Sequence, residues 1–476
     1  MAGDRQRRSG GFAFEFSVNL QARTVFRWVL AAGLLAMLGA NLPGHMSYDS
    51  VAQLYEGHFH IRETWGPALY AWMLGFFDRF IPGTSLYVTV SAAVLFAALA
   101  AMAGLRPRTS WWAVLAAAAA MLTPQVIIYQ GIVWKDVMFA NCAIAGVVLI
   151  AYAERAWADR PRRWALLICA LLLMAAGAQV RQNGIIAGAF ASLALGWIAA
   201  HAPGGPRRWR RGVAWAVGAL VALVVVGQVE TALSEPPKAP KDTALGTGLR
   251  IVQSFDVIGA MARDPTWRPQ ALIAANPTAT GIVQARAKAD YSGRRVDFVD
   301  RDQKIQVGLN ALSDKAMSDQ WFDLVFRHPA LYLRVRWEDF RWVFAPPVID
   351  WCLPVYVGVD APEEKMAPLG LQHRYVQSDV MLSNYASWFL DTPVYSHVFY
   401  TVLSLALGGL LLCRRQGADI PMAALQFAGA AFAASFFIIS IACDYRYLYF
   451  TDLAALAGLI YVALDPTLRR TSDPAP

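Results

Sequence analysis

The apolar block TVFRWVLAAGLLAMLGANL at residues 24–42 runs directly into the polar stretch PGHMSYDSVAQLYEGHFHIRETWGPALY at residues 43–70. The block has about the 20-residue length of a membrane-spanning helix. The stretch after it is dense in ionisable side chains, although charged residues make up only 16% of the chain. The pattern predicts a first span followed by a loop with a chemical role. The ionisable side chains are Asp49, Glu56, Glu63, His45, His58 and His60.

The whole chain repeats this alternation of apolar blocks and short polar links. It has 476 residues, of which 57% are hydrophobic, and a mean hydropathy of +0.38. Soluble domains are less apolar and carry more charge. The formal charge of +8 comes from short basic clusters between the apolar blocks. Such clusters are typical of cytoplasmic loops and not of a nucleic-acid-binding surface, so we predict a polytopic membrane protein.

The distribution of basic residues decides the predicted topology. The RQRR tail before the first block places the N-terminus inside. Residues 66–81, GPALYAWMLGFFDRFI, either cross the membrane or lie on its outer surface as an amphipathic helix. Only a surface helix leaves the later basic loops inside, beginning with residues 106–108. The predicted spans are then 24–42, 84–104, 110–130, 137–152, 164–180, 184–200, 212–233, 394–413, 421–443 and 445–464.

These spans predict an all-α polytopic membrane protein with about ten transmembrane helices. A periplasmic surface helix follows the first span, and a mostly helical external segment lies between the seventh and eighth spans. In that segment we expect a helix at residues 249–262, an amphipathic helix at 317–344 on the outer leaflet or capping the bundle, and a Pro-rich loop at 345–368. The regions are a cytoplasmic tail at 1–23, an N-terminal transmembrane module at 24–233 that includes the first external loop at 43–83, the external segment at 234–393, C-terminal transmembrane helices at 394–464 and a cytoplasmic tail at 465–476.

The cysteines and histidines give weaker signals. Four cysteines lie in or at the ends of apolar blocks, and Cys352 stands alone in the external segment, so no disulfide framework is expected. No Cys/His spacing typical of a metal site occurs. His58 and His60 with Glu56 leave a divalent metal possible but not implied. The four cysteines are Cys142, Cys169, Cys413 and Cys443.

Four polar groups interrupt the apolar blocks at what the predicted topology makes one external face. Asp49 follows the first span, and Lys135-Asp136 lies between the third and fourth. Ionisable residues at membrane depth cost about 2.5–3.5 kcal/mol each on insertion scales and therefore mark functional sites. We predict that one pocket contains all four groups. The other two are Arg181-Gln182-Asn183, between the fifth and sixth spans, and Asp444-Tyr445-Arg446-Tyr447, between the ninth and tenth.

Each group also has a purely structural interpretation. Ser47 or Asp49 suits the N-cap of a helix that begins at SYDSVAQLY. Lys135 and Asp136 could be interfacial residues that pair with each other, and Arg181 an ordinary helix-end arginine. The Asp and Arg of DYRY could form a local ion pair on a tight turn. The residues alone leave these alternatives open.

The motifs PGHMSYDSVAQ, VWKDVMFA, VRQNGI and DYRYLYF occur in this order along the chain. The ordered set resembles the GT-C superfamily of polyprenyl-phosphate-sugar-dependent glycosyltransferases, including family 39-like bacterial enzymes, which place an essential acid where Asp49 stands. In the following surface helix the family's usual His is missing at Trp65-Gly66. FRHPALYLRVRW resembles the family's His-Pro-x-x-Tyr helix before the late spans. The matching positions are Pro67, Leu69, Tyr70, Lys135, Asp136, Phe139, Arg181, Asn183, Gly184, Arg446 and Tyr447.

The resemblance implies an inverting transfer of a sugar from a polyprenyl-phosphate donor to a glycan, lipid or protein acceptor at the outer face of a bacterial inner membrane. Asp49 would be the base that takes the acceptor's proton. Arg181 and Arg446 would hold the departing phosphate, with Lys135 in reserve. Asp136 would orient the acceptor or the sugar, and no cofactor is implied. The other expected substrate-binding residues are Asn183, Asp444 and Tyr447, with Tyr48, Trp65 and Tyr445 as stacking platforms.

Two other classes of protein remain as alternatives. A transporter or flippase of a lipid-linked sugar would need polar residues near the bilayer midplane and broken helices in repeated halves. The charged groups gather at one face instead, and no internal repeat is visible in the sequence. A non-catalytic subunit of envelope assembly is the third possibility.

Overall fold

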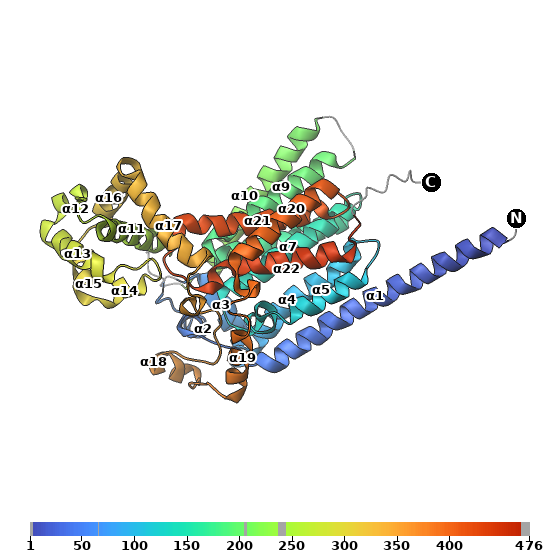
Figure 1. Cartoon of the computed structure of the whole chain (residues 1–476), viewed down its shortest axis with the longest axis horizontal. Helices are drawn as coiled ribbons and strands as arrows, with labels where there is room; N and C mark the ends of the chain where they lie inside the picture. Colours follow the sequence, from blue (N-terminus) through green and yellow to red (C-terminus); the bar gives the residue numbers. More distant parts are fainter. Residues whose placement is uncertain (1–2, 65, 204–206, 237–243, 468–476) are drawn as a thin grey trace.

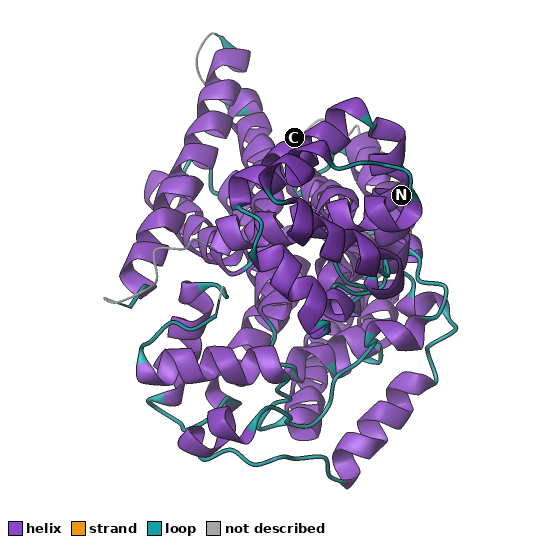
Figure 2. Ribbon diagram, turned by 90° about the vertical axis from the view of Figure 1, so that its left-hand side faces the viewer, coloured by secondary structure: helices purple, strands orange, loops and turns teal. Residues whose placement is uncertain are grey.

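The computed structural model of the chain describes residues 3–64, 66–203, 207–236 and 244–467. These residues are mostly helical and contain no β-strand, only isolated bridges (Figure 2). The prediction of an all-α protein is confirmed. In Figure 1 the long apolar helices form one bundle, and helices α11 to α17 form a separate group at one end of it.

Nine helices within the described residues are long and apolar enough to cross a membrane, or ten if one bent pair counts as a single span. They correspond to the ten predicted spans, and the chain is a polytopic membrane protein. The nine lie in α1 (Gly3–Asn41), α4 (Ser85–Met102), α7 (Lys135–Arg155), α8 (Arg160–Val180), α9 (Ile185–His201), α10 (Arg208–Ser234), α20 (His397–Arg414), α21 (Asp419–Ile439) and α22 (Tyr449–Leu464).

The bent pair corrects the prediction of a continuous third span at 110–130. Helix α5 (Trp111–Met121) ends before Pro124, and α6 (Pro124–Ile127) with the 3₁₀ turn Tyr129–Gly131 continues at 68° to it. Pro124 has no N–H to donate to the preceding turn and suits the first position of a new helix. The bend turns the chain toward the start of α7, where Lys135 and Asp136 stand.

Helices α7 and α22 form the centre of the bundle. In their most apolar windows 89% and 78% of the residues are buried, against 17% for α10. Both helices are apolar on every side and rich in small residues, as in ANCAIAGVVLIAYA of α7. Helices of that kind are buried and let their neighbours approach closely. The first residues of α7 and the turn before α22 are therefore held in a rigid setting.

Two short helices follow α1, joined to it by the turn at Pro43-Gly44. Helix α2 (Tyr48–Phe59) and helix α3 (Ala68–Asp78) pack against each other. A Cβ on Gly57 or Gly75 would lie within about 2 Å of the backbone carbonyl oxygen of the partner helix, so only glycine permits this approach. At 11 residues α3 is too short to cross a membrane. This agrees with the prediction that residues 66–81 do not form a span.

Residues 255–335 of the external segment have a hydrophobic core of their own, whereas later residues of the segment pack into the core of the bundle. The helix expected at residues 249–262 is confirmed as α11 (Ala244–Arg263). The single helix expected at 317–344 is wrong: α16 (Asp314–Arg327) and α17 (Pro329–Phe344) meet at His328, because Pro329 begins a new helix. The remaining helices are α12 (Gln270–Ala275), α13 (Pro277–Asp290), α14 (Asp297–Arg301), α15 (Gln303–Asn310), α18 (Glu363–Met366) and α19 (Gln377–Ser387).

A disulfide joins Cys352 of the external segment to Cys443 at the end of the ninth predicted span. The expectation that Cys352 stands alone is therefore wrong. The two residues are separated by 91 positions, and only the tertiary fold brings them together.

Candidate functional site

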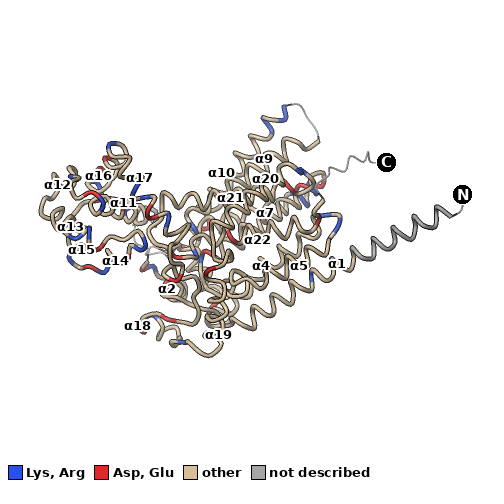
Figure 3. The backbone as a smooth tube through the Cα atoms, viewed as in Figure 1, with Lys and Arg blue, Asp and Glu red and all other residues tan. Residues whose placement is uncertain are grey.

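The four polar groups predicted to share a face all lie at helix ends. Asp49 is in the first turn of α2, and Lys135 and Asp136 open α7. Arg181 is the residue after α8, and Asp444 and Arg446 lie in the turn between α21 and α22. In Figure 3 the charged residues of the bundle lie mainly toward its two ends. The contact of Arg295 with Asp444 places this group at the end nearer the external segment.

Asp49 and Arg446 form the ion pair at the centre of the site. Arg446 donates from Nη2 to Asp49 Oδ2 at 2.6 Å, across 397 positions of sequence. The Asp49 side chain is 52% exposed, whereas that of Arg446 is 13% exposed. Partial burial opposes ionisation of Asp49, but the charges of Arg446 and Lys135 and the hydrogen bond from Arg446 outweigh it, so the pKa of Asp49 lies below its usual value. Asp49 is therefore an ionised, solvent-accessible carboxylate, and its pairing with Arg446 excludes helix capping as its only role.

A second acid–guanidinium pair lies beside the first. Arg181 Nη1 is 2.5 Å from Asp136 Oδ1, with both side chains largely buried. The Arg181 guanidinium also lies 5.0 Å from the centre of the Tyr447 ring. Lys135 interacts electrostatically with both acids and both arginines of the two pairs. Asp136 therefore pairs with Arg181 from another helix, and Arg181 is more than an ordinary helix-end residue.

The external segment reaches the site through Arg295. Its Nη2 donates to Asp444 Oδ1 at 2.7 Å, while Asp444 Oδ2 lies 3.3 Å from Arg446 Nη2. The local pair of Asp444 and Arg446 therefore exists, but as one link in a chain that runs from Arg295 to Asp49. Arg446 also lies over the Trp134 ring at 4.9 Å. Arg295 and Trp134 were not predicted; arginine is common in a polar segment, and tryptophan is common at a helix start near a membrane surface.

The acids and imidazoles around Asp49 have structural roles. His45 is buried and accepts from the Gly358 N–H at 2.9 Å. Burial, followed by the charge of Arg374, lowers the pKa of His45 to about 4. Glu56 Oε1 accepts two backbone N–H groups of the loop after α2, and His58 Nδ1 lies 2.6 Å from an oxygen of Asp78. No group of three potential metal ligands occurs among the described residues.

Tyr48, Asn183 and Tyr445 are the other predicted substrate-binding residues that the structure describes. Tyr48 is 52% exposed at the start of α2, and Asn183 donates to the Ser435 hydroxyl at 3.2 Å. Tyr445 is wrong as a stacking platform, because it is buried against His397 and donates its O–H to Asp452 at 2.6 Å. Trp65 lies outside the described residues.

The arrangement combines an accessible carboxylate with a group of cations. Four cationic side chains, Lys135, Arg181, Arg295 and Arg446, meet three carboxylates, those of Asp49, Asp136 and Asp444. Such a site can accept a proton at Asp49 and hold an anionic group at the guanidinium groups. The fold and the site together define a polytopic membrane protein with a charged site at one end of its bundle.

No family model and no curated protein matches the sequence. Among solved structures the chain is similar to a crystal structure of the Archaeoglobus fulgidus oligosaccharyltransferase in complex with Zn and sulfate, with a TM-score of 0.40, 13% identity and coverage of 92% of this chain and 48% of that one. It is also similar to the oligosaccharyltransferase AglB from Archaeoglobus fulgidus in complex with an inhibitory peptide and a dolichol-phosphate, with a TM-score of 0.40, 14% identity and coverage of 92% and 50%. The chain spans about half the length of these structures. Likeness at this TM-score does not decide the function of the chain.

Proposed function

We propose that the chain is a GT-C type glycosyltransferase that moves a sugar from a polyprenyl-phosphate donor to an acceptor of the cell envelope, with inversion at the transferred carbon. Two observations support the proposal. The first is the resemblance of its four ordered motifs to that superfamily. The second is the pairing of Asp49 with Arg446, because an ionised carboxylate beside a buried guanidinium supplies both functions that the transfer needs.

The Asp49–Arg446 pair is the observation that carries the proposal. Arg446 is 13% exposed and its Nη2 contacts both Asp49 and Asp444. A donor phosphate would compete with Asp49 for this guanidinium. Loss of that contact would raise the basicity of the carboxylate, since the Arg446 charge holds its pKa down. Donor binding would in this way prepare Asp49 to act as the base.

The transfer itself is a single displacement. Asp49 takes the proton of the acceptor hydroxyl, whose oxygen attacks the anomeric carbon from the face opposite the phosphate. The bond between that carbon and the phosphate oxygen breaks, and polyprenyl phosphate leaves with the electron pair. Arg446 and Arg181 stabilise the negative charge on the leaving phosphate, with Lys135 close by. Asp136 holds Arg181 in place.

The location follows from the same proposal. The chain would lie in a bacterial inner membrane, with both termini in the cytoplasm and the site at the external face. The positive-inside distribution of the basic loops and the disulfide between Cys352 and Cys443 support this orientation. The charged groups lie at helix ends. A flippase would need polar residues near the bilayer midplane, so this arrangement supports an enzyme over a flippase.

The test uses purified full-length protein and a panel of synthetic polyprenyl-phosphate hexoses and pentoses, with envelope extract as acceptor. Mass spectrometry measures the polyprenyl phosphate released. The expected result is release that requires the acceptor and is lost in Asp49→Asn. If the protein moves the intact donor across vesicle membranes without breaking it, the chain is a transporter and the proposal fails.

A further inference from the structure

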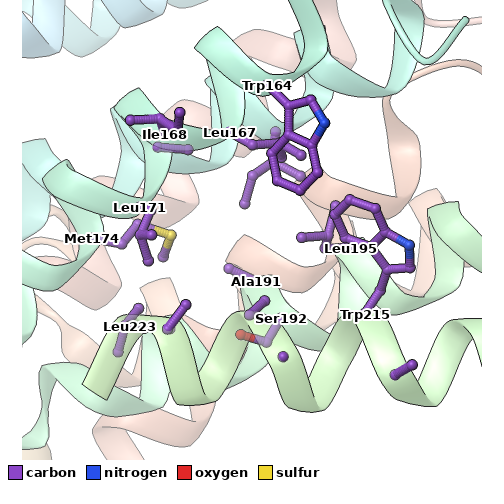
Figure 4. A pocket seen from close by; sticks show the side chains of 17 residues that line it. Trp164, Leu167, Ile168, Leu171, Met174, Ala191, Ser192, Leu195, Trp215 and Leu223 are labelled. Carbon is purple, nitrogen blue, oxygen red and sulfur yellow. The ribbon is translucent and has the colours of Figure 1, made fainter. Parts of the chain in front are cut away.

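A groove with apolar walls lies between α8, α9 and α10 (Figure 4). Its volume is about 430 Å³. Ser192 carries the only hydroxyl among its lining residues, and none of the lining residues within the described part of the chain is charged. A cavity of this chemistry suits a hydrocarbon chain and offers little to a sugar or a phosphate.

The groove faces the lipid and not the interior of the bundle. Trp164 and Ile168 on its wall are 49% and 51% exposed. Helix α10, which forms another wall, is also the least buried of the nine spanning helices. In a membrane these surfaces contact acyl chains directly, so lipid has open access to the groove.

The groove spans the middle of α8, and its two ends lie toward opposite ends of the bundle. On α8 its last lining residue is Met174, seven positions before Arg181, a rise of about 10 Å. At the other end Trp164 stands only four positions after the start of α8. Figure 4 shows Trp164 and Trp215 at one end of the groove and Met174 and Leu223 at the other. The tryptophan end is therefore the end of the groove that lies away from the candidate site.

Arginines gather at that tryptophan end. The guanidinium of Arg163 lies 5.8 Å from the Trp164 ring and 5.9 Å from the Trp215 ring, both of which line the groove. Asp159, the acid nearest in sequence, caps α8 by accepting from the backbone N–H of Arg162. The helix ends that carry Trp164 and Trp215 are also basic in sequence, with Arg160 and Arg162 at the start of α8 and Arg208, Arg210 and Arg211 at the start of α10. We call these arginines with Arg163 the arginine rim.

We propose that this groove is a binding site for an anionic phospholipid, with an acyl chain between α8, α9 and α10 and the phosphate against the arginine rim. Basic pockets between transmembrane helices at the cytoplasmic side bind anionic headgroups in this way. The tail of a polyprenyl-phosphate donor is the competing occupant. Its phosphate belongs at Arg446 and Arg181, at the other end of the bundle, so the charge of the rim favours the phospholipid.

The experiment measures lipid binding to the full-length protein by native mass spectrometry. The probes are phosphatidylglycerol, phosphatidylethanolamine and a synthetic polyprenyl phosphate. Phosphatidylglycerol should bind at least fivefold more tightly than phosphatidylethanolamine, the ratio expected for about one basic contact. Arg163→Gln should lower that preference, because Arg163 is the arginine beside both groove tryptophans. Equal binding of the two phospholipids to the unmodified protein overturns the proposal.

A second variant tests the groove without disturbing the arginines. Gly218 lines the groove, and a Cβ built there meets nothing within 4 Å, so Gly218→Phe fills the space without a clash. It should weaken phosphatidylglycerol binding more than tenfold. Gly409→Phe, at another helical glycine with open space, and Arg108→Gln, at an exposed arginine in the loop before α5, should leave binding unchanged. If Gly218→Phe weakens only the binding of polyprenyl phosphate, the groove belongs to the donor and the proposal fails.

Discussion

Replacement of Asp49 by asparagine separates the chemical role of this residue from its structural role. The change removes one negative charge and keeps the size of the side chain. Loss of a general base lowers a rate by about 10²–10⁴-fold, which is about 3–5 kcal/mol of barrier. The structural cost is far smaller, because the Asp49 side chain is 52% exposed and exposed ion pairs contribute about 0–1 kcal/mol. Arg446 is not left without a partner, since Asp444 remains at 3.3 Å.

The assay compares acceptor-dependent release of polyprenyl phosphate with thermal unfolding of the same preparations. Asp49→Asn should lose at least a hundredfold in rate while its midpoint of unfolding stays close to that of the unmodified protein. Glu63→Gln is the matched control, because Glu63 is a 44% exposed acid of the same external loop and pairs with Lys365. It should leave the rate unchanged. An Asp49→Asn rate within tenfold of the unmodified protein would refute the assignment of Asp49 as the base.

Three further predictions follow from other parts of the structure. Arg181→Ala should raise the KM for the donor by about tenfold or more, since a hydrogen bond to a charged group contributes about 1.5–3 kcal/mol. The KM for the acceptor should not change. Steady-state kinetics with each substrate varied in turn test this, and equal effects on both KM values would show that Arg181 does not bind the phosphate. Arg336→Met should destabilise the external segment by about 3–5 kcal/mol, because Arg336 is fully buried and bonded to two buried carboxylates. Exchange of backbone amide hydrogens should accelerate in α17 but not in α7. The pKa of His45 is about 4 in the folded chain, against an ordinary value of 6.5. Between these pH values the unfolded chain binds a proton at His45 that the folded chain does not. About 3 kcal/mol of the free energy of unfolding, present above pH 6.5, should therefore be lost as the pH falls to 4. Unfolding measured against pH should show a smaller loss in His45→Gln.

The spans could be predicted from the sequence because each apolar block is long and bounded by polar or basic residues. The choice of a surface helix at 66–81 followed from charge alone, and the 11 residues of α3 agree with it. Two helix breaks were not predicted, although Pro124 and Pro329 lie inside the apolar and the amphipathic stretch that were each predicted as one helix. A proline inside such a pattern predicts a boundary more reliably than the surrounding periodicity predicts continuity.

The site was partly predictable for a related reason. The predicted topology fixes which helix ends share a face of the membrane. The proximity of Asp49 to Arg446, and of Arg181 to the start of α7, could therefore be expected from the sequence. Topology does not fix the direction of side chains within a turn. Tyr445 and Arg446 are neighbours, yet the first points into the bundle and the second toward Asp49. The disulfide partner of Cys352 was hidden for a similar reason, because the pairing depends on where the external segment folds back onto the bundle.

The contacts of the external segment with the bundle determine the position of the turn that carries Arg446. The external segment holds the turn between α21 and α22 at several points. Arg336 donates to the carbonyl oxygen of Ser440, Cys443 is bonded to Cys352, and Arg295 pairs with Asp444. Arg446 lies in this same turn. An arginine that must hold a phosphate and release a carboxylate needs a fixed backbone, because small displacements of charged groups change their interaction strongly at short distances. The external segment therefore acts as the support that orients Arg446 toward Asp49, and loosening it should impair transfer.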